Sequence, residues 1–278
     1  MGVPSWIPRP RARRKRPSAH DVKKRLEQTY GRTFVRAADI AEQLFCEKKV
    51  ELRLLHPEVK KGARQLSGLA GHEELSADAR PISRKELSEQ LASGKKVLLR
   101  ESPFSGLYRG IPIIGRPDLV FFNGKRPHFL VDYKFSTKRE TYPDQRLQVA
   151  LYGMLLHQNK FETEGLVTII AFVPRAAAEG HLESRLLRIY QRLRETALAQ
   201  QGQAEHQDQD VACFADPFDL KQAKKLMDAQ IDFWLGLRLA VPTRHSRKCS
   251  VCEFNAAGLC ESALTQPKPT LKMDETWT

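Results

Sequence analysis

The stretch from Gly115 to Tyr152 constrains the fold more than any other part of this chain of 278 residues. It contains two apolar runs, 119–122 and 129–131, that are rich in the branched and aromatic residues favoured in β-strands. Between them lies Asn123-Gly124, a pair typical of hairpin turns because both residues tolerate positive φ. The sequence therefore predicts a β-hairpin in this stretch.

The register of this hairpin decides which charged side chains meet. If the turn centres on Lys125, Asp118 lies directly opposite Asp132, with Cβ atoms roughly 4.5–5.5 Å apart. A two-residue loop at Asn123-Gly124 would shift the register and break this pairing. Lys134 follows Asp132 by two residues, so the two side chains point to the same face. Because adjacent carboxylates repel each other without a cation, the pattern predicts a site for a hard ion such as Mg²⁺. The alternative is a hairpin with scattered surface charges.

A helix is predicted after Tyr142-Pro143. Leu147 and Leu151 recur at helical spacing and should pack on the sheet. Gln148 and Tyr152 are also four residues apart and share a face beside that apolar stripe. They are placed to hydrogen-bond the groups of a metal site or a nucleic-acid backbone, although such a pair also occurs as an ordinary rim contact.

Three short motifs of this stretch resemble those of a known family. Gly115-Arg116-Pro117-Asp118, Asp132-Tyr133-Lys134 and Gln148-x3-Tyr152 look like the motifs of the PD-(D/E)XK nuclease superfamily, in its RecB-like branch. The resemblance implies an α/β fold with a restriction-endonuclease-like core of helix, three strands, helix and strand. Residues 166–172 would form the fourth strand of a mixed sheet, and added helices and a C-terminal segment clasped by cysteines would surround the core.

The resemblance also implies a role for each motif residue. A divalent ion, Mg²⁺ or Mn²⁺, would be bound by His72, Asp118, Asp132 and the backbone carbonyl of Tyr133. Lys134 would orient the attacking water or stabilise the charged phosphorane. Gln148 and Tyr152 would position the substrate and the active-site groups.

The cysteines indicate a second site. Cys249-x2-Cys252-x7-Cys260 has the close spacing of a metal or cluster site, and spacing alone leaves either Cys46 or Cys213 as a fourth ligand. Zinc and an iron–sulfur cluster both accept four thiolates. A disulfide framework is disfavoured because the cysteine count is odd and no signal peptide is visible.

Resemblance favours one choice of fourth ligand. Cys46 looks like the single early cysteine of CRISPR-associated RecB-like nucleases and of exonuclease V. In those proteins one early and three late cysteines hold a [4Fe-4S] cluster that clasps the two chain ends over the nuclease core. The resemblance therefore implies a cluster bound by Cys46, Cys249, Cys252 and Cys260, and it leaves Cys213 as an ordinary thiol.

The charge of the chain favours an anionic partner. Lys and Arg number 46 against 33 Asp and Glu, a formal charge of +13. No run approaches the roughly 20 apolar residues that span a bilayer, so a membrane partner is not expected. Residues 1–19 are basic, proline-rich and free of acidic residues, which predicts a disordered basic tail. We expect a single nuclease domain over 20–265 and a flexible tail over 266–278.

Hydrophobic periodicity and capping signals predict the remaining elements. Helices are expected over 21–30, 38–55, 182–201 and 217–239, and another should begin at Ser83. Residues 96–100 should form the first core strand, and the polar run 200–210 should be a loop.

Taken together, the motifs and the charge predict metal-dependent cleavage of a nucleic acid. The resemblance implies that the protein is a DNA exonuclease that acts on single-stranded ends. Its setting would be DNA repair or replication, or else CRISPR spacer acquisition. The alternative from another class is a DNA-binding module that keeps the fold without cutting. We expect an intracellular protein, cytoplasmic in a prokaryote, with the nucleus as the eukaryotic alternative. The sequence does not identify any protein partner.

Overall fold

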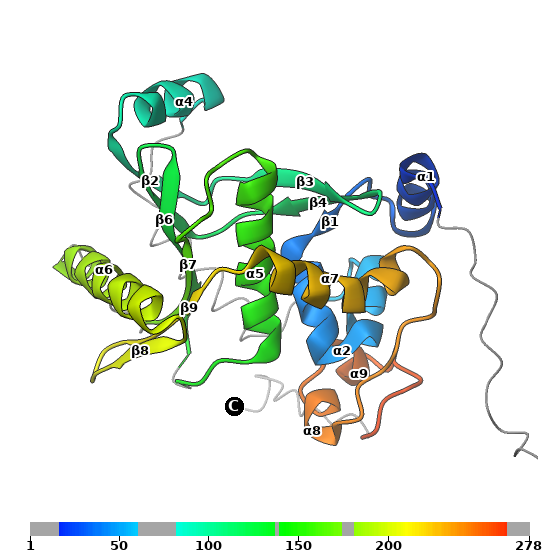
Figure 1. The fold of residues 1–278 in the computed structure, drawn as a ribbon. Helices are drawn as coiled ribbons and strands as arrows, with labels where there is room; N and C mark the ends of the chain where they lie inside the picture. The colour runs from blue at the N-terminus through cyan, green and yellow to red at the C-terminus, as the bar shows by residue number, and fades with distance from the viewer. Residues whose placement is uncertain (1–16, 61–81, 137–138, 174–180, 266–278) are drawn as a thin grey trace, which may run out of the picture.

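A six-stranded mixed sheet lies at the centre of the protein, whose computed structural model describes residues 17–60, 82–136, 139–173 and 181–265 (Figure 1). Its strands, in spatial order, are β2 (Lys96–Arg100), β5 (Leu119–Asn123), β6 (Arg126–Lys134), β7 (Val167–Phe172), β9 (Ala212–Pro217) and β8 (Ala204–Gln207). Strands β6 and β7 are parallel, and the other neighbours are antiparallel. Helix α5 (Pro143–Gln158) makes the crossover between β6 and β7 that a parallel pair requires.

A smaller sheet and several helices surround this centre. The smaller sheet has the order β1 (Val35–Arg36), β4 (Ile111–Gly115) and β3 (Phe104–Tyr108). The other helices are α1 (Ala19–Tyr30), α2 (Ala37–Leu55), α4 (Arg84–Ala92), α6 (His181–Gln200), α7 (Leu220–Trp234), α8 (Ser246–Cys249) and α9 (Glu253–Ala256). Figure 1 shows α5 standing beside the large sheet, α2 and α7 next to α5, and α6 on the other side of the sheet.

The two faces of the large sheet belong to two separate apolar cores. On one face Val120 and Leu130 pack with the apolar stripe of α5. On the other face Leu119 and Val131 pack with α6. Since side chains alternate along a strand, the even-numbered positions of the β5–β6 hairpin face α5.

The predicted fold class is confirmed. The core order of helix, three strands, helix and strand appears as α4, β2, β5, β6, α5 and β7. Strands β3 and β4 lie between β2 and β5 in the sequence and pair with β1 instead of joining the large sheet. The helices expected over 21–30, 38–55 and 182–201 are present within one or two residues of the predicted ends. Ser83 caps α4 as predicted, because its hydroxyl accepts from the Glu86 N–H at 3.1 Å.

One predicted helix is present but shorter than expected, and one predicted loop contains a strand. The helix expected over 217–239 begins only at Leu220, where Asp219 accepts the first free N–H groups of the helix, and it ends at Trp234. Pro217 instead closes β9, which pairs with β7. The loop expected over 200–210 contains β8, an edge strand whose polar sequence carries little apolar signal. The predicted tails fall largely or wholly on residues 1–16 and 266–278, outside the described residues.

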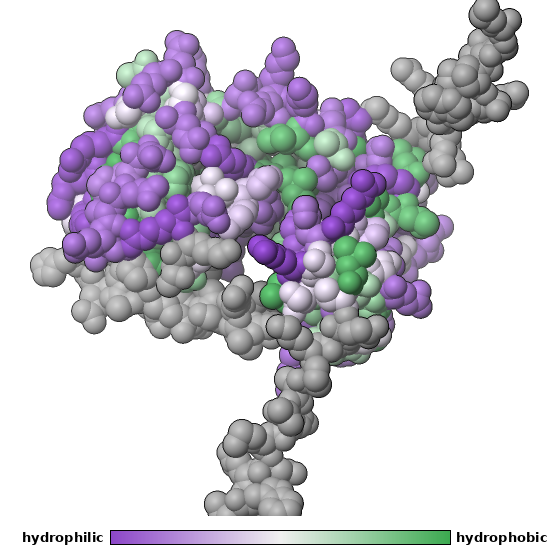
Figure 2. Space-filling view, turned by 90° about the horizontal axis from the view of Figure 1, so that it is seen from below, coloured by the Kyte–Doolittle hydropathy of each residue, from purple (hydrophilic) through white to green (hydrophobic). Residues whose placement is uncertain are grey.

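The surface differs from one side to the other. Seen from below, hydrophilic side chains cover most of the side that carries α6, whereas hydrophobic ones appear in patches on the side of α8 and α9 (Figure 2). Exposed apolar side chains of the C-terminal segment include Leu239, Val241 and Val251. Among the helices that the structure describes, none is long and apolar enough to span a bilayer.

Candidate active site and cysteine cavity

The β5–β6 hairpin has the predicted register at its open end. Leu119 pairs with Val131. The turn itself is a two-residue loop, in which Gly124 has a positive φ of 56°. A bulge on β6 then inserts His128 and shifts the pairing by one residue. The predicted register is therefore correct at this end, although it comes from a shorter turn plus a bulge.

Continuing the Leu119–Val131 pairing by one residue places Asp118 opposite Asp132. The Asp118 carboxylate accepts a hydrogen bond from the Tyr133 N–H at 2.6 Å. Asp132 is only 2% exposed, and its carboxylate lies 2.5 Å from the Lys134 ammonium. Because these positions all face α5, the two carboxylates and the ammonium form one charged site, in which Asp132 is buried and Asp118 and Lys134 are half-buried.

Lys134 stays charged in this site. Burial alone would lower the pKa of Lys134, but Asp132, and after it Asp118, raise that pKa above its ordinary value. The ammonium is therefore retained at neutral pH. It provides a fixed positive charge beside two carboxylates.

The backbone of Tyr133 offers a further oxygen. The N–H and C=O groups of one strand residue point to the same edge of the strand. The Tyr133 N–H points to Asp118, so its carbonyl points to that side too. Two carboxylates and a carbonyl oxygen match the ligands of a hard divalent cation.

Helix α5 places Gln148 and Tyr152 beside these groups. The Lys134 ammonium donates to the Gln148 side-chain oxygen at 3.5 Å, and the Gln148 amide donates to the Tyr152 hydroxyl at 2.7 Å. Burial, together with the charges of Asp132 and Asp118, raises the pKa of Tyr152 well above its ordinary value, so the hydroxyl keeps its proton.

Gly115, the first residue of the opening motif, explains how closely β4 approaches α5. A Cβ at this position would lie 2.6 Å from the Leu155 side chain and 2.8 Å from the Tyr152 ring. A larger residue would therefore push Tyr152 away from its position. Close packing of β4 against α5 therefore explains why the motif has a glycine at position 115.

Sequence reasoning missed one acidic residue near the site. Asp144 lies in the first turn of α5, four residues before Gln148, and so on the same helical face. Burial raises the pKa of Asp144, while the positive charges of Lys134 and Lys248 act in the opposite direction. The four-residue spacing to Gln148 was the signal that could have identified it.

The structure thus brings six of the predicted residues together, namely Asp118, Asp132, Tyr133, Lys134, Gln148 and Tyr152. His72 lies outside the described residues, so its part in the site stays a prediction.

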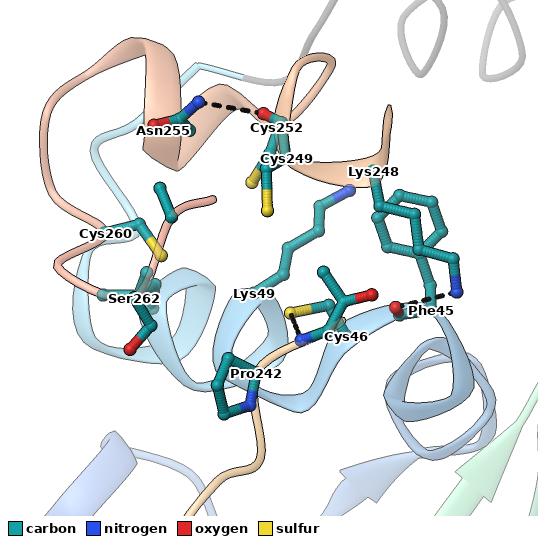
Figure 3. A pocket seen from close by; sticks show the side chains of 13 residues that line it. Phe45, Cys46, Lys49, Pro242, Lys248, Cys249, Cys252, Asn255, Cys260 and Ser262 are labelled. Atoms are coloured by element: carbon teal, nitrogen blue, oxygen red, sulfur yellow. Dashed lines mark hydrogen bonds between the residues drawn. The ribbon is translucent and has the colours of Figure 1, made fainter. Parts of the chain in front are cut away.

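The four cysteines predicted as cluster ligands line one cavity (Figure 3). Cys46 lies at a kink in α2, where its backbone is extended at φ −170° and ψ 117°. Cys249 ends α8, Cys252 caps α9, and Cys260 follows α9. The cavity therefore joins an N-terminal helix to the C-terminal segment.

Cys213 is not part of this cavity. It lies on β9, buried in the core beneath α6, and burial raises the pKa of its thiol to about 12. All five cysteines fall within the described residues, and each is a free thiol.

Hydrogen bonds hold the walls of the cavity. The Thr243 N–H donates to the Cys46 sulfur at 3.4 Å, and the Asn255 amide donates to the Cys249 carbonyl at 3.0 Å. Burial raises the pKa of the Cys252 and Cys260 thiols.

The cavity is lined by four thiols with no disulfide, which is the type of donor that binds a zinc ion or an iron–sulfur cluster. Within the described ranges, no three histidine, cysteine or carboxylate side chains lie close enough together to hold one metal ion. At the carboxylate site the described side-chain ligands are two, Asp118 and Asp132.

Comparison with known proteins gives a family match. A sequence model of the PD-(D/E)XK nuclease superfamily matches residues 16–259. No curated protein matches the chain by sequence. A solved structure, "Crystal structure of SSO0001", is similar at a TM-score of 0.44 and 15% identity, with 88% of this chain and 95% of that chain covered. At that TM-score the likeness does not by itself establish a shared fold.

Proposed function

Because the chain belongs to the PD-(D/E)XK nuclease superfamily, we propose that it is a RecB-like, metal-dependent exonuclease that cuts single-stranded DNA from its ends. The observation that carries this proposal is the meeting of Asp118, Asp132 and Lys134 at one end of the β5–β6 hairpin. The formal charge of +13 supports a polyanionic substrate.

Asp118, Asp132 and the carbonyl of Tyr133 would hold Mg²⁺ or Mn²⁺, with His72 as a further predicted ligand. A bound divalent ion lowers the pKa of its water and neutralises charge on the leaving oxygen. The Tyr133 N–H holds the Asp118 carboxylate at 2.6 Å, which fixes one ligand before the ion arrives. Such pre-organisation reduces the cost of assembling the site.

Lys134 contributes a charge that the ion does not supply. Its ammonium is retained at neutral pH beside Asp132, so it can hold a phosphate oxygen as negative charge develops there. Gln148 accepts from that ammonium and donates to Tyr152, which sets the direction of the lysine side chain. The protonated Tyr152 hydroxyl is a donor for a substrate oxygen.

We propose that the cysteine cavity binds a [4Fe-4S] cluster through Cys46, Cys249, Cys252 and Cys260. The four thiols surround a cavity between the N-terminal helix α2 and the C-terminal segment. The cluster would have a structural role, because phosphodiester hydrolysis transfers no electrons. Iron and sulfide analysis of protein purified without oxygen tests this point, and stoichiometric zinc in place of iron would contradict it.

Cleavage of end-labelled single-stranded DNA tests the nuclease. Wild type with Mg²⁺ or Mn²⁺ should release short products from a linear strand and leave a circular single strand intact. Asp132→Ala should lose this activity by at least a hundredfold. Asp210→Ala is the matched control, since this aspartate lies on the β8–β9 turn, its side chain is 57% exposed, and it pairs with Arg185 of α6.

Three outcomes would count against the proposal. Equal cutting by wild type and Asp132→Ala would remove Asp132 from the reaction. Cutting of the circle would make the protein an endonuclease. Tight DNA binding by iron-loaded wild type without any cutting would favour the non-cleaving module.

A further inference from the structure

A buried lysine reaches into the cysteine cavity. Lys49 is 8% exposed and lines the cavity together with the four cysteines. Figure 3 shows its side chain extending across the space between Cys46 and Cys249. A buried lysine is rare unless it is paired or has a charge to offset.

We propose that Lys49 is the buried cation that offsets the negative charge of the thiolate-bound group and so sets its reduction potential. This inference rests on the proposed cluster. Whether the group is zinc or an oxidised [4Fe-4S] cluster, four thiolates outnumber its positive charges, and the loaded cavity carries net negative charge. Burying such charge is costly without a nearby cation.

The contacts of Lys49 keep its ammonium at the wall of the cavity. The ammonium lies 3.0 Å from the Glu42 carboxylate and 3.4 Å from the Glu253 carboxylate. Glu253 follows Cys252 directly in the sequence, so this ion pair connects α2 to the cysteine segment.

A second ammonium supports the same wall. The ammonium of Lys49 lies 5.1 Å from the centre of the Phe45 ring, and the ammonium of Lys248 lies 4.9 Å from it. Lys248 also donates to the carbonyls of Leu44 and Phe45, at 3.2 and 3.0 Å, where the kink at Cys46 interrupts the helix. Lys248 thus holds the backbone that presents Cys46. Both lysines line the cavity, and Lys49 is the more deeply buried of the two.

The sign of the effect follows from charge. Reduction by one electron, supplied for example by dithionite, makes the cluster and its thiolates one unit more negative. A buried positive charge stabilises the reduced form and raises the potential, and a buried negative charge lowers it. Lys49 and Glu253 carry the opposite charges of one ion pair. Removing the charge of Lys49 and removing the charge of Glu253 should therefore shift the reduction potential in opposite directions.

The neighbouring lysine offers a graded control. Lys48 is one residue away, has a 31% exposed side chain and pairs with Glu51 at 2.6 Å. Water screens an exposed charge far more than a buried one. Removal of Lys48 should therefore shift the potential less than removal of Lys49.

The test is a redox titration of the full chain, purified without oxygen and followed by electron paramagnetic resonance. Lys49→Met should shift the cluster potential to more negative values, Glu253→Gln to more positive values, and Lys48→Met only slightly. Glu253→Gln keeps the test decisive if Lys49→Met does not fold. Equal shifts for Lys48→Met and Lys49→Met, or shifts of the same sign for Lys49→Met and Glu253→Gln, would overturn the inference.

Iron content and DNA cleavage separate this inference from the proposals beneath it. Wild type that cuts DNA but contains no iron would overturn the cluster and this inference and leave the nuclease intact. If the variants show the predicted shifts in potential but the iron-loaded wild type cuts no DNA, this inference would be supported and the nuclease contradicted.

Discussion

Replacing Lys134 by Met tests how the buried charges of the candidate site balance one another. The ammonium lies 2.5 Å from the carboxylate of Asp132, which is 2% exposed. Methionine keeps much of the length of the side chain and removes its charge. The two carboxylates, Asp118 and Asp132, then face each other without a cation.

Removing one partner of a buried ion pair costs about 3–5 kcal/mol, because the other charge is left unpaired. The Lys134 side chain is 23% exposed, so water can reach part of the site. We therefore expect Lys134→Met to lower the free energy of unfolding by about 3 kcal/mol, at the lower end of this range, without divalent ions.

A divalent cation should reverse much of this loss. An ion at 100 times its Kd stabilises a folded protein by about 2.7 kcal/mol. In wild type the ion competes with the Lys134 ammonium for the same carboxylates. Without that competitor, Lys134→Met should bind Mn²⁺ about tenfold more tightly, which adds about 1.4 kcal/mol to the stabilisation at a fixed Mn²⁺ concentration.

Urea denaturation with EDTA or with Mn²⁺ measures both effects in the same variants. Asp132→Asn should lose the stabilisation by Mn²⁺, and the exposed control Asp210→Asn should keep the wild-type value. An equal gain from Mn²⁺ in wild type, Lys134→Met and Asp132→Asn would refute the reasoning, because the ion would then bind elsewhere.

Three further perturbations have defined outcomes. Gly115→Ala should cost about 1–3 kcal/mol and reduce DNA cleavage, because its Cβ would lie 2.8 Å from the Tyr152 ring; unchanged melting and cleavage would contradict this. Trp234→Phe removes a buried hydrogen bond of 2.5 Å to Gln43 and should cost about 1–3 kcal/mol in urea denaturation; an unchanged midpoint would show that the bond contributes nothing. Burial opposes ionisation of Glu47, but hydrogen bonds from an arginine and a backbone N–H hold its pKa below the ordinary 4.5. The ionised Glu47 therefore stabilises the fold above pH 4.5, and this stabilisation is lost as the pH falls through the lower pKa of the folded state. In acid denaturation, Glu47→Gln should make the free energy of unfolding depend less steeply on pH. A curve parallel to that of wild type would exclude Glu47 as a cause.

The hairpin shows what sequence reasoning captured and where it stopped. The apolar runs and the Asn-Gly signal predicted the two strands and the hairpin, and placing the centre of the turn at Lys125 predicted the register at Asp118. The bulge at His128 has no such signal, since it depends on how β6 fits against β5. The register was therefore predicted correctly from an incomplete account of the turn.

Elements at the edge of the sheet were harder to predict. Strand β8 is short and polar, and it exists because it pairs with β9 across the turn at 208–211, a contact that the apolar pattern of β8 does not indicate. The end of α7 was misplaced for a related reason, since the apolar residues after Trp234 continue the pattern without continuing the helix.

Residues of the candidate sites could be predicted where a motif placed them on a particular face of a strand or helix. Gln148 indicated a helical face next to the carboxylates, and the same face would have indicated Asp144. The burial of Lys49 was not predictable, because a lysine among charged residues in a helix is expected to lie on the surface. Its burial depends on the folding of the C-terminal cysteine segment against α2.

A crystal structure of the full chain grown with Mn²⁺ tests the account of the active site most directly. Anomalous scattering should place the ion in contact with the carboxylates of both Asp118 and Asp132 and with the carbonyl of Tyr133. Manganese bound at another place, or its absence from this site in crystals soaked to saturation, would contradict the account.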